Sequence, residues 1–137
     1  MILRAVLVIL ACIILVSIVN FLLYIHPPKY TSAITPEDIG LIYEPVSLKT
    51  SDGLRLAGWF IPNNNSHNAV LVLHGYPFDK GNILTAVSFL AKDFNLLLVD
   101  FRYFGASEGK VTTVGYREAI DVQTAVSYLK SKGFQDI

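Results

Sequence analysis

The sequence predicts an α/β domain that is preceded by one membrane-spanning helix. Two observations carry this prediction. An apolar segment without charged residues occupies positions 5–25. After residue 43, two strands around a tight turn are followed by two continuous apolar runs that alternate with amphipathic helical patterns. Buried strands that alternate with helices are typical of α/β proteins, in which helices cover a largely parallel sheet.

The composition fits a small globular domain with an apolar N-terminal segment. Of the 137 residues 53% are hydrophobic, above the usual ~45–50%, and the excess lies in residues 1–25. The 11 basic and 11 acidic residues cancel and form no basic stripe, so nucleic acid is not expected as a partner. The single cysteine, Cys12, excludes an intrachain disulfide, and the sequence predicts no metal site and no cofactor.

Residues 1–25 are expected to form a transmembrane anchor that contacts the lipid bilayer through residues 5–25. These 21 positions include 15 Ile, Leu, Val or Phe residues, and about 20 residues cross a hydrocarbon core as a helix. A cleavable signal peptide would need a shorter apolar core and a small-residue cleavage site, and a buried core helix would be shorter or carry a polar stripe. Arg4 precedes the span, which favours an inside amino terminus and an extracytoplasmic domain.

Residues 26–43 are expected to form a juxtamembrane linker. Pro27 and Pro28 end the apolar helix, because proline cannot continue a helix and restricts the residue before it. The sequence Thr-Pro-Glu-Asp at 35–38 predicts a short helical turn. The folded domain should then occupy residues 44–137.

A hairpin is expected to open the domain. Val46 and Leu48 alternate with polar neighbours, as in a half-buried strand. Ser51-Asp52-Gly53 is a turn signal, and a returning strand over 54–61 ends at Pro62.

Two buried strands and two helices are predicted after the hairpin. The apolar runs at 69–73 and 95–100 suit strands covered on both faces. Apolar side chains recur at helical spacing over 81–92 and over 115–132. Residues 136–137 have the character of a further strand, so the second crossover is expected to be left open by truncation, natural or through gene disruption.

Three motifs resemble the α/β-hydrolase superfamily. They are Ser-Asp-Gly-Leu-Arg-Leu-Ala-Gly-Trp-Phe-Ile-Pro at 51–62, Leu-Val-Leu-His-Gly-Tyr at 71–76 and Asp-Phe-Arg-Tyr-Phe-Gly-Ala-Ser-Glu-Gly at 100–109. In this order they are similar to the N-terminal half of that fold, and most similar to its serine aminopeptidase-like, acyl-peptidase-like branch, which includes membrane-anchored members. The resemblance implies an N-terminal hairpin followed by β-α-β-α of a mostly parallel sheet. Tyr103 departs from the pattern, which commonly has glycine there, so altered packing is expected.

The resemblance implies an oxyanion-hole donor in this chain. In the superfamily, one backbone N–H of the hole comes from the loop after the third strand. Here it would be the N–H of Tyr76, directly after His74 and Gly75, where the glycine lets the backbone approach a substrate. The plainer interpretation is that His74 and Gly75 only end a strand.

Residues 105–109 match the nucleophile-elbow pattern Gly-x-Ser-x-Gly letter for letter. An elbow needs a strand that runs directly into the turn and a helix directly after it, whereas this strand ends near Asp100 and a loop follows the motif. Ser107 is therefore predicted to be a decoy that supports a turn. Asp100 and Arg102 are expected to bond locally at the end of the strand, and they and Gly105 are expected to support the motif.

The resemblance implies a membrane-anchored serine hydrolase that cleaves an ester, amide or peptide bond of a small-molecule or peptide substrate. The true elbow is expected just after residues 136–137, and the catalytic acid and histidine later still. Because the triad is absent, the 137-residue chain is expected to be inactive by itself. The alternative is a non-catalytic membrane-tethered interaction module or pseudoenzyme.

Overall fold

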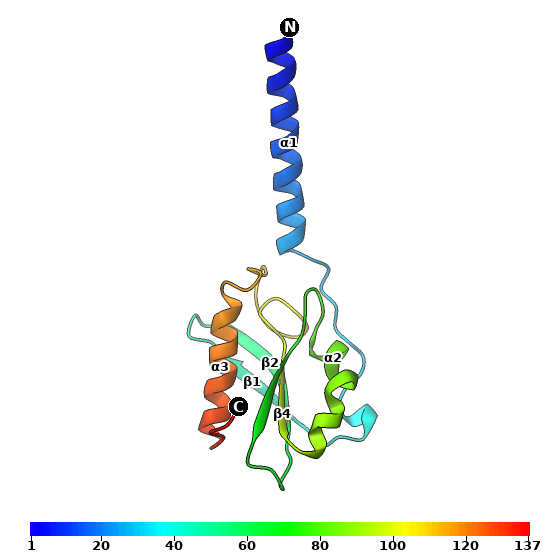
Figure 1. Cartoon of the computed structure of the whole chain (residues 1–137), viewed down its shortest axis with the longest axis vertical. Helices are drawn as coiled ribbons and strands as arrows, with labels where there is room; N and C mark the ends of the chain where they lie inside the picture. The colour runs from blue at the N-terminus through cyan, green and yellow to red at the C-terminus, as the bar shows by residue number, and fades with distance from the viewer.

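A long helix projects from an α/β domain in the computed structural model, which describes residues 1–137 (Figure 1). The helix α1 spans Ile2–Ile25, has a mean hydropathy of 3.1 in its most apolar window, and is nowhere buried by the domain. Ser17 and Asn20 satisfy their side chains within it by donating to the backbone carbonyl four residues earlier. The predicted anchor is thus a helix long and apolar enough to cross a membrane.

The juxtamembrane residues 26–43 run beside the domain on the side that carries α2 (Figure 1). The predicted helical turn is present as η1 (Glu37–Ile39). The N–H and the hydroxyl of Thr35 both donate to the carboxylate of Asp38, at 2.8 Å each. These hydrogen bonds lower the pKa of Asp38.

The domain contains one mixed sheet. Strands β1 (Glu44–Lys49) and β2 (Arg55–Ile61) form the predicted antiparallel hairpin, and β3 (Ala69–Leu73) and β4 (Asn95–Val99) complete the order β1-β2-β4-β3. β2 pairs with β4 antiparallel, and β3 pairs with β4 parallel. The parallel part of the sheet that the sequence predicts is therefore the β3–β4 pair.

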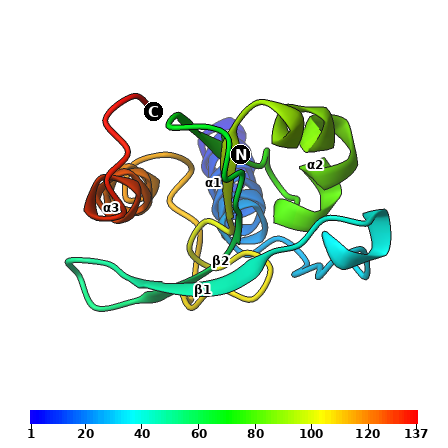
Figure 2. The same ribbon diagram turned by 90° about the horizontal axis from the view of Figure 1, so that it is seen from below.

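Helices cover both faces of the sheet. Helix α2 (Lys80–Val87) and the 3-10 helix η2 (Ser88–Lys92) lie on one face, and α3 (Glu118–Ser131) lies on the other (Figure 2). Each face has its own apolar core, and β4 contributes alternate residues to the two cores. All five residues of β4 are buried, as expected for a continuous apolar run at the centre of a sheet.

Two helix boundaries differ from the sequence prediction. The helix expected over 81–92 is regular only to Val87; at Ser88, whose hydroxyl donates to a backbone carbonyl three residues earlier, the chain tightens into η2. The helix expected from residue 115 begins at Glu118. Gly115 has a φ of +105°, which is incompatible with a right-handed helix, and its N–H donates to the Glu118 carboxylate instead.

Residues 136–137 do not form a strand in the structure, although the sequence predicts the start of one. One backbone hydrogen bond joins this segment to β3: the N–H of Ala69 donates to the carbonyl of Asp136 at 3.2 Å. β3 is otherwise an edge strand of the sheet.

Candidate active-site edge

The candidate site lies where β3 and β4 end. Because these strands are parallel, the loops that follow them, 74–79 and 100–117, meet at one edge of the sheet. Ligands of open α/β sheets bind outside such carboxyl ends. This edge faces the end of α1 (Figure 1). All the predicted site residues come from these two loops: His74, Gly75, Tyr76, Asp100, Arg102, Gly105 and Ser107.

His74 is buried and uses both ring nitrogens. The N–H of Phe101 donates to Nε2 at 3.0 Å, so Nδ1 carries the proton and donates to the Gly75 carbonyl at 3.1 Å. Burial lowers the pKa of His74, which favours this neutral ring. The imidazole therefore joins the end of β3 to the loop after β4, and neither nitrogen is available to a substrate.

The backbone after His74 has a free donor. The N–H of Tyr76 donates no hydrogen bond, and a Cβ placed on Gly75 would meet nothing within 4 Å. The N–H of Phe78 donates to the Gly75 carbonyl at 2.9 Å and closes the turn. Beside the turn is a pocket of about 330 Å³, which is lined by His74, Gly75, Phe78, Asn82, Ile83 and Ala86. Tyr76 itself does not line this pocket, and stabilisation of an oxyanion requires a donor aimed at the reacting oxygen.

Asp100 is fully buried, and its carboxylate accepts three hydrogen bonds. Its carboxylate accepts from the backbone N–H of Lys80 at 2.8 Å, from the ammonium of Lys80 at 2.5 Å and from the N–H of Ala106 at 2.9 Å. A Cβ at Gly105, where φ is +50°, would overlap this carboxylate, so only glycine fits there. The bond to Ala106 is local, as expected, but Lys80 precedes Asp100 by 20 residues and was not anticipated.

Arg102 is also buried, and its partners are not local. Its guanidinium pairs with Asp121 of α3, at 2.8 Å, and with Asp52 of the β1–β2 turn, at 2.7 Å. These partners lie 19 and 50 residues away in the sequence. The hydrogen bonds from Arg102 lower the pKa of Asp52 to about 2. The expectation of local bonding is therefore wrong for Arg102, which ties three separate elements together.

Ser107 points into the protein. Its hydroxyl donates to the Asp100 carbonyl at 2.7 Å and accepts from the N–H of Ala57 at 2.9 Å, so both hydrogen-bonding roles are used. The neighbouring Glu108 pairs with Arg55. No helix starts directly after this motif, because α3 begins at Glu118.

Tyr103 shows why glycine is common at its position in the resembling family. Its φ is +74°, in the left-handed region that favours glycine. The side chain is engaged by the juxtamembrane segment: its hydroxyl donates to the Pro27 carbonyl at 2.5 Å, and its ring meets that of His26 edge to face. The altered packing expected at Tyr103 is therefore a contact with the residues that follow the anchor.

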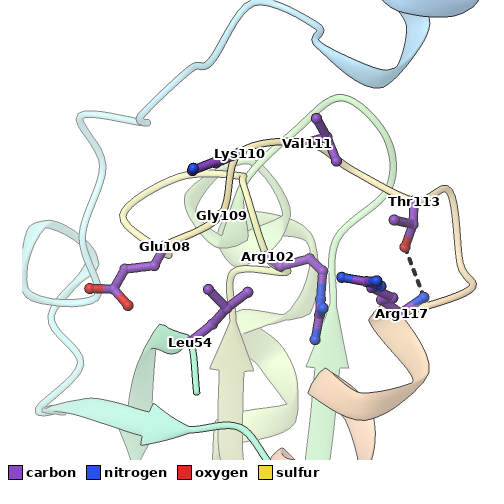
Figure 3. Close-up of a pocket in the computed structure, with 8 residues that line it drawn as sticks. All are labelled: Leu54, Arg102, Glu108, Gly109, Lys110, Val111, Thr113 and Arg117. Atoms are coloured by element: carbon purple, nitrogen blue, oxygen red, sulfur yellow. Dashed lines mark hydrogen bonds between the residues drawn. The ribbon is translucent and has the colours of Figure 1, made fainter. Parts of the chain in front are cut away.

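A second pocket, of about 430 Å³, lies beside the loop after β4 (Figure 3). It is lined by Leu54, Arg102, Glu108, Gly109, Lys110, Val111, Thr113 and Arg117. The side chains of Lys110 and Arg117 form no hydrogen bond or ion pair; the bond drawn at Arg117 is from its backbone N–H to Thr113. No group of three or more His, Cys, Asp or Glu side chains is placed to hold a metal ion.

Comparison with known proteins places this fold. The structure matches an esterase of Pyrococcus furiosus, Pf2001, with a TM-score of 0.73 and 37% identity, over 79% of this chain and 42% of the esterase. In sequence, the chain is 33% identical over 104 residues to the α/β-hydrolase domain-containing protein WAV2 of Arabidopsis thaliana, covering 72% of this chain and 33% of WAV2. It is 28% identical over 102 residues to an uncharacterised membrane protein of Saccharomyces cerevisiae, covering 73% of this chain and 35% of that protein.

The resemblance to the α/β-hydrolase superfamily is thereby confirmed at the level of the fold. No protein-family model matches the chain, and the comparisons do not distinguish one branch of the superfamily from another. The chain spans about a third to two fifths of the relatives named here.

Proposed function

We propose that the chain is the anchor and the N-terminal part of a membrane-anchored serine hydrolase that cleaves an ester, amide or peptide bond. The observation that supports this most is the unpaired N–H of Tyr76, at the carboxyl end of β3 and beside a pocket of about 330 Å³. A positioned donor of this kind is worth roughly 3–4 kcal/mol to a tetrahedral transition state.

In this proposal the chain supplies the oxyanion side of the site, and the nucleophile, acid and histidine come from elsewhere. His74 positions the turn through its two ring bonds, and Gly75 leaves the approach to the Tyr76 N–H open. The 137 residues alone are then inactive. The motif order supports the serine aminopeptidase-like, acyl-peptidase-like branch, and the esterase named above keeps ester cleavage among the proposed activities.

The nucleotide sequence downstream of codon 137, read in all three frames, tests the proposed enzyme. We expect it to encode a strand that runs into Gly-x-Ser-x-Gly and then a helix, which is the form of a nucleophile elbow. If no frame encodes this pattern, the serine hydrolase is wrong.

A fluorophosphonate probe tests the assignment of Ser107. We expect no labelling of the 137-residue chain, because the hydroxyl is buried and hydrogen-bonded on both sides. The control variant is Ser127→Ala, on the exposed face of α3. If the chain were labelled, and Ser107→Ala but not Ser127→Ala abolished the labelling, Ser107 would be a nucleophile.

A non-catalytic membrane-tethered module is the second candidate, and one observation favours it. No buried side-chain nitrogen or oxygen lacks a hydrogen-bond partner within these residues, as expected of a unit that folds by itself.

For either candidate we propose that the anchor crosses the membrane once, with the domain on the extracytoplasmic side. Protease added to intact cells should then cut the domain, and a domain left uncut would reverse the orientation.

A further inference from the structure

The end of the anchor is bonded to both loops of the candidate active-site edge. The hydroxyl of Tyr76 donates to the carbonyl of Tyr24 at 2.9 Å, and the two rings stack with centroids 4.9 Å apart. On the other loop, the N–H of Thr112 donates to the carbonyl of Ile25 at 3.1 Å. These bonds involve the last turn of α1, so they fix the edge directly beneath the anchor (Figure 1).

The residues just after the anchor add two further bonds to the same edge. Tyr103 donates to the Pro27 carbonyl, from a left-handed conformation that is costly for a tyrosine. The ammonium of Lys29 donates to the Ser107 carbonyl at 3.0 Å. Where α1 crosses a bilayer, its end at Ile25 sets the level of the membrane surface, and the edge of the sheet then faces the lipid.

The loop nearest the anchor presents apolar side chains outward. Val114 is 52% exposed and Tyr116 is 84% exposed, so neither side chain belongs to an apolar core. Val114 has a φ of +52°, a strained conformation for a β-branched residue. The buried Glu118 holds this conformation, because its carboxylate accepts the N–H groups of Thr113 and Gly115 at 2.8 Å each. The fold thus keeps an apolar tip in place at a conformational cost.

Two unpaired cations flank this tip. Lys110 and Arg117 are exposed, line the pocket of about 430 Å³ and have no carboxylate partner (Figure 3). The acidic groups nearby do not neutralise them, because Glu108 pairs with Arg55 and Glu118 is occupied by the loop backbone. The segment therefore combines exposed apolar side chains with net positive charge.

We propose that residues 110–117 form a bilayer-docking surface. Val114 and Tyr116 enter the interfacial region of the membrane, and Lys110 and Arg117 lie at the level of anionic lipid headgroups. Aromatic side chains favour that region, and basic side chains near it are attracted to anionic lipid. The occupant is lipid because the membrane-spanning helix ends against this same edge. The docking does not depend on the proposed hydrolase activity.

Fluorescence of a single label in the full chain tests this surface. In a Cys12→Ser background, an environment-sensitive dye is attached at Tyr116→Cys or, as the matched control, at Asn64→Cys in the β2–β3 loop at the far end of the domain (Figure 1). The protein is reconstituted into vesicles of phosphatidylcholine with phosphatidylglycerol. We expect blue-shifted emission, and quenching by lipids with a shallow quencher, at position 116 but not at 64. Equal exposure of the two labels to water would overturn the proposal.

The two cations are tested with the double variant Lys110→Gln/Arg117→Gln. Each basic residue near an anionic surface contributes about fivefold, so the ratio of docked to undocked tip should fall about 25-fold on mixed vesicles and little on phosphatidylcholine alone. The control Lys92→Gln/Lys130→Gln, away from the tip, should leave the ratio unchanged. An equal response of the two double variants would overturn the role of Lys110 and Arg117. Emission that followed the protein-to-lipid ratio would indicate a second copy as the occupant and would also overturn the proposal.

Discussion

At the scale of single residues, the Asp-x-Arg motif acts through buried charge. A carboxylate or guanidinium removed from water must be paired and hydrogen-bonded, or it destabilises the fold by several kcal/mol (on the order of 3–5). Asp100 meets this condition with Lys80 and Ala106, and Arg102 meets it with Asp121 and Asp52. The motif therefore fixes the loop after β4 by bonds to distant elements rather than by chemistry of its own.

The two glycines of the site should respond differently to substitution. Gly105→Ala is expected to destabilise the domain by about 2–4 kcal/mol, because the new Cβ would overlap the Asp100 carboxylate and the left-handed backbone would be strained. Gly75→Ala should cost less than about 0.5 kcal/mol, because its Cβ meets nothing within 4 Å. Urea unfolding of the full chain in detergent measures both. Similar losses at the two positions would contradict this account of Gly105.

Tyr103 should couple the juxtamembrane segment to the domain. Tyr103→Phe removes the bond to Pro27 and keeps the ring, so we expect the stability of the domain to change by no more than about 1.5 kcal/mol. The amide protons of residues 26–32 should exchange faster, because one of their links to the edge is lost. Hydrogen exchange measured by mass spectrometry resolves this segment. Tyr128→Phe, which removes a hydroxyl on α3 that makes no bond to residues 26–32, is the matched control, and equal exchange in the two variants would refute the coupling.

At the scale of elements, local pattern predicts the strands and helices but not where they stop. The apolar runs of β3 and β4 and the turn at Asp52 are visible in the sequence, because period and turn chemistry are local. The start of α3 is not visible in the local sequence, because it depends on the carboxylate of Glu118, which accepts a hydrogen bond from the backbone N–H of Gly115. The break at Ser88 likewise depends on a side-chain bond.

The same limit applies to the site. Motif resemblance located Tyr76 and the loop after β4, but nothing local shows that Lys80 is buried, since lysine is ordinarily exposed. Its burial follows from the buried carboxylate of Asp100, 20 residues later. Asp121 was missed in the same way, because its partner comes from another element. Pairings between distant elements need the fold before they can be predicted.

The link between the hairpin turn and α3 should depend on pH through Asp52. Hydrogen bonds from Arg102 lower the pKa of Asp52 from 3.8 to about 2. A lowered folded-state pKa means that the stabilisation is fully present above pH 3.8 and is lost as the pH falls toward about 2. The stability difference between wild type and Asp52→Asn should therefore shrink over this window, as measured by urea midpoints. Asp93→Asn, at an exposed aspartate without an ion pair, is the control, and an equal trend in the two variants would contradict this role of Asp52.

At the scale of the whole molecule, the two edges of the sheet differ. β1 is a protected edge, because it carries Pro45 and the charged residues Glu44 and Lys49. β3 is apolar along its length and is paired on its outer side only by the bond between Ala69 and Asp136. An open apolar edge is a site for pairing with another strand. Its state therefore distinguishes a part of a larger domain from a self-sufficient module.

Hydrogen exchange of the β3 amides measures whether this edge is paired with another strand. Successive N–H groups of a strand point to opposite sides, and that of Ala69 points away from β4, so those of Leu71 and Leu73 do as well. In the monomeric chain we expect these two amides to exchange on the order of 10²-fold faster than those of Val70 and Val72, which donate to β4. Slow exchange at all four positions that was lost on dilution would instead show that a second copy pairs with β3. Self-association would then cover the edge. A self-sufficient interaction module requires such a cover, whereas a lone N-terminal part of an enzyme does not.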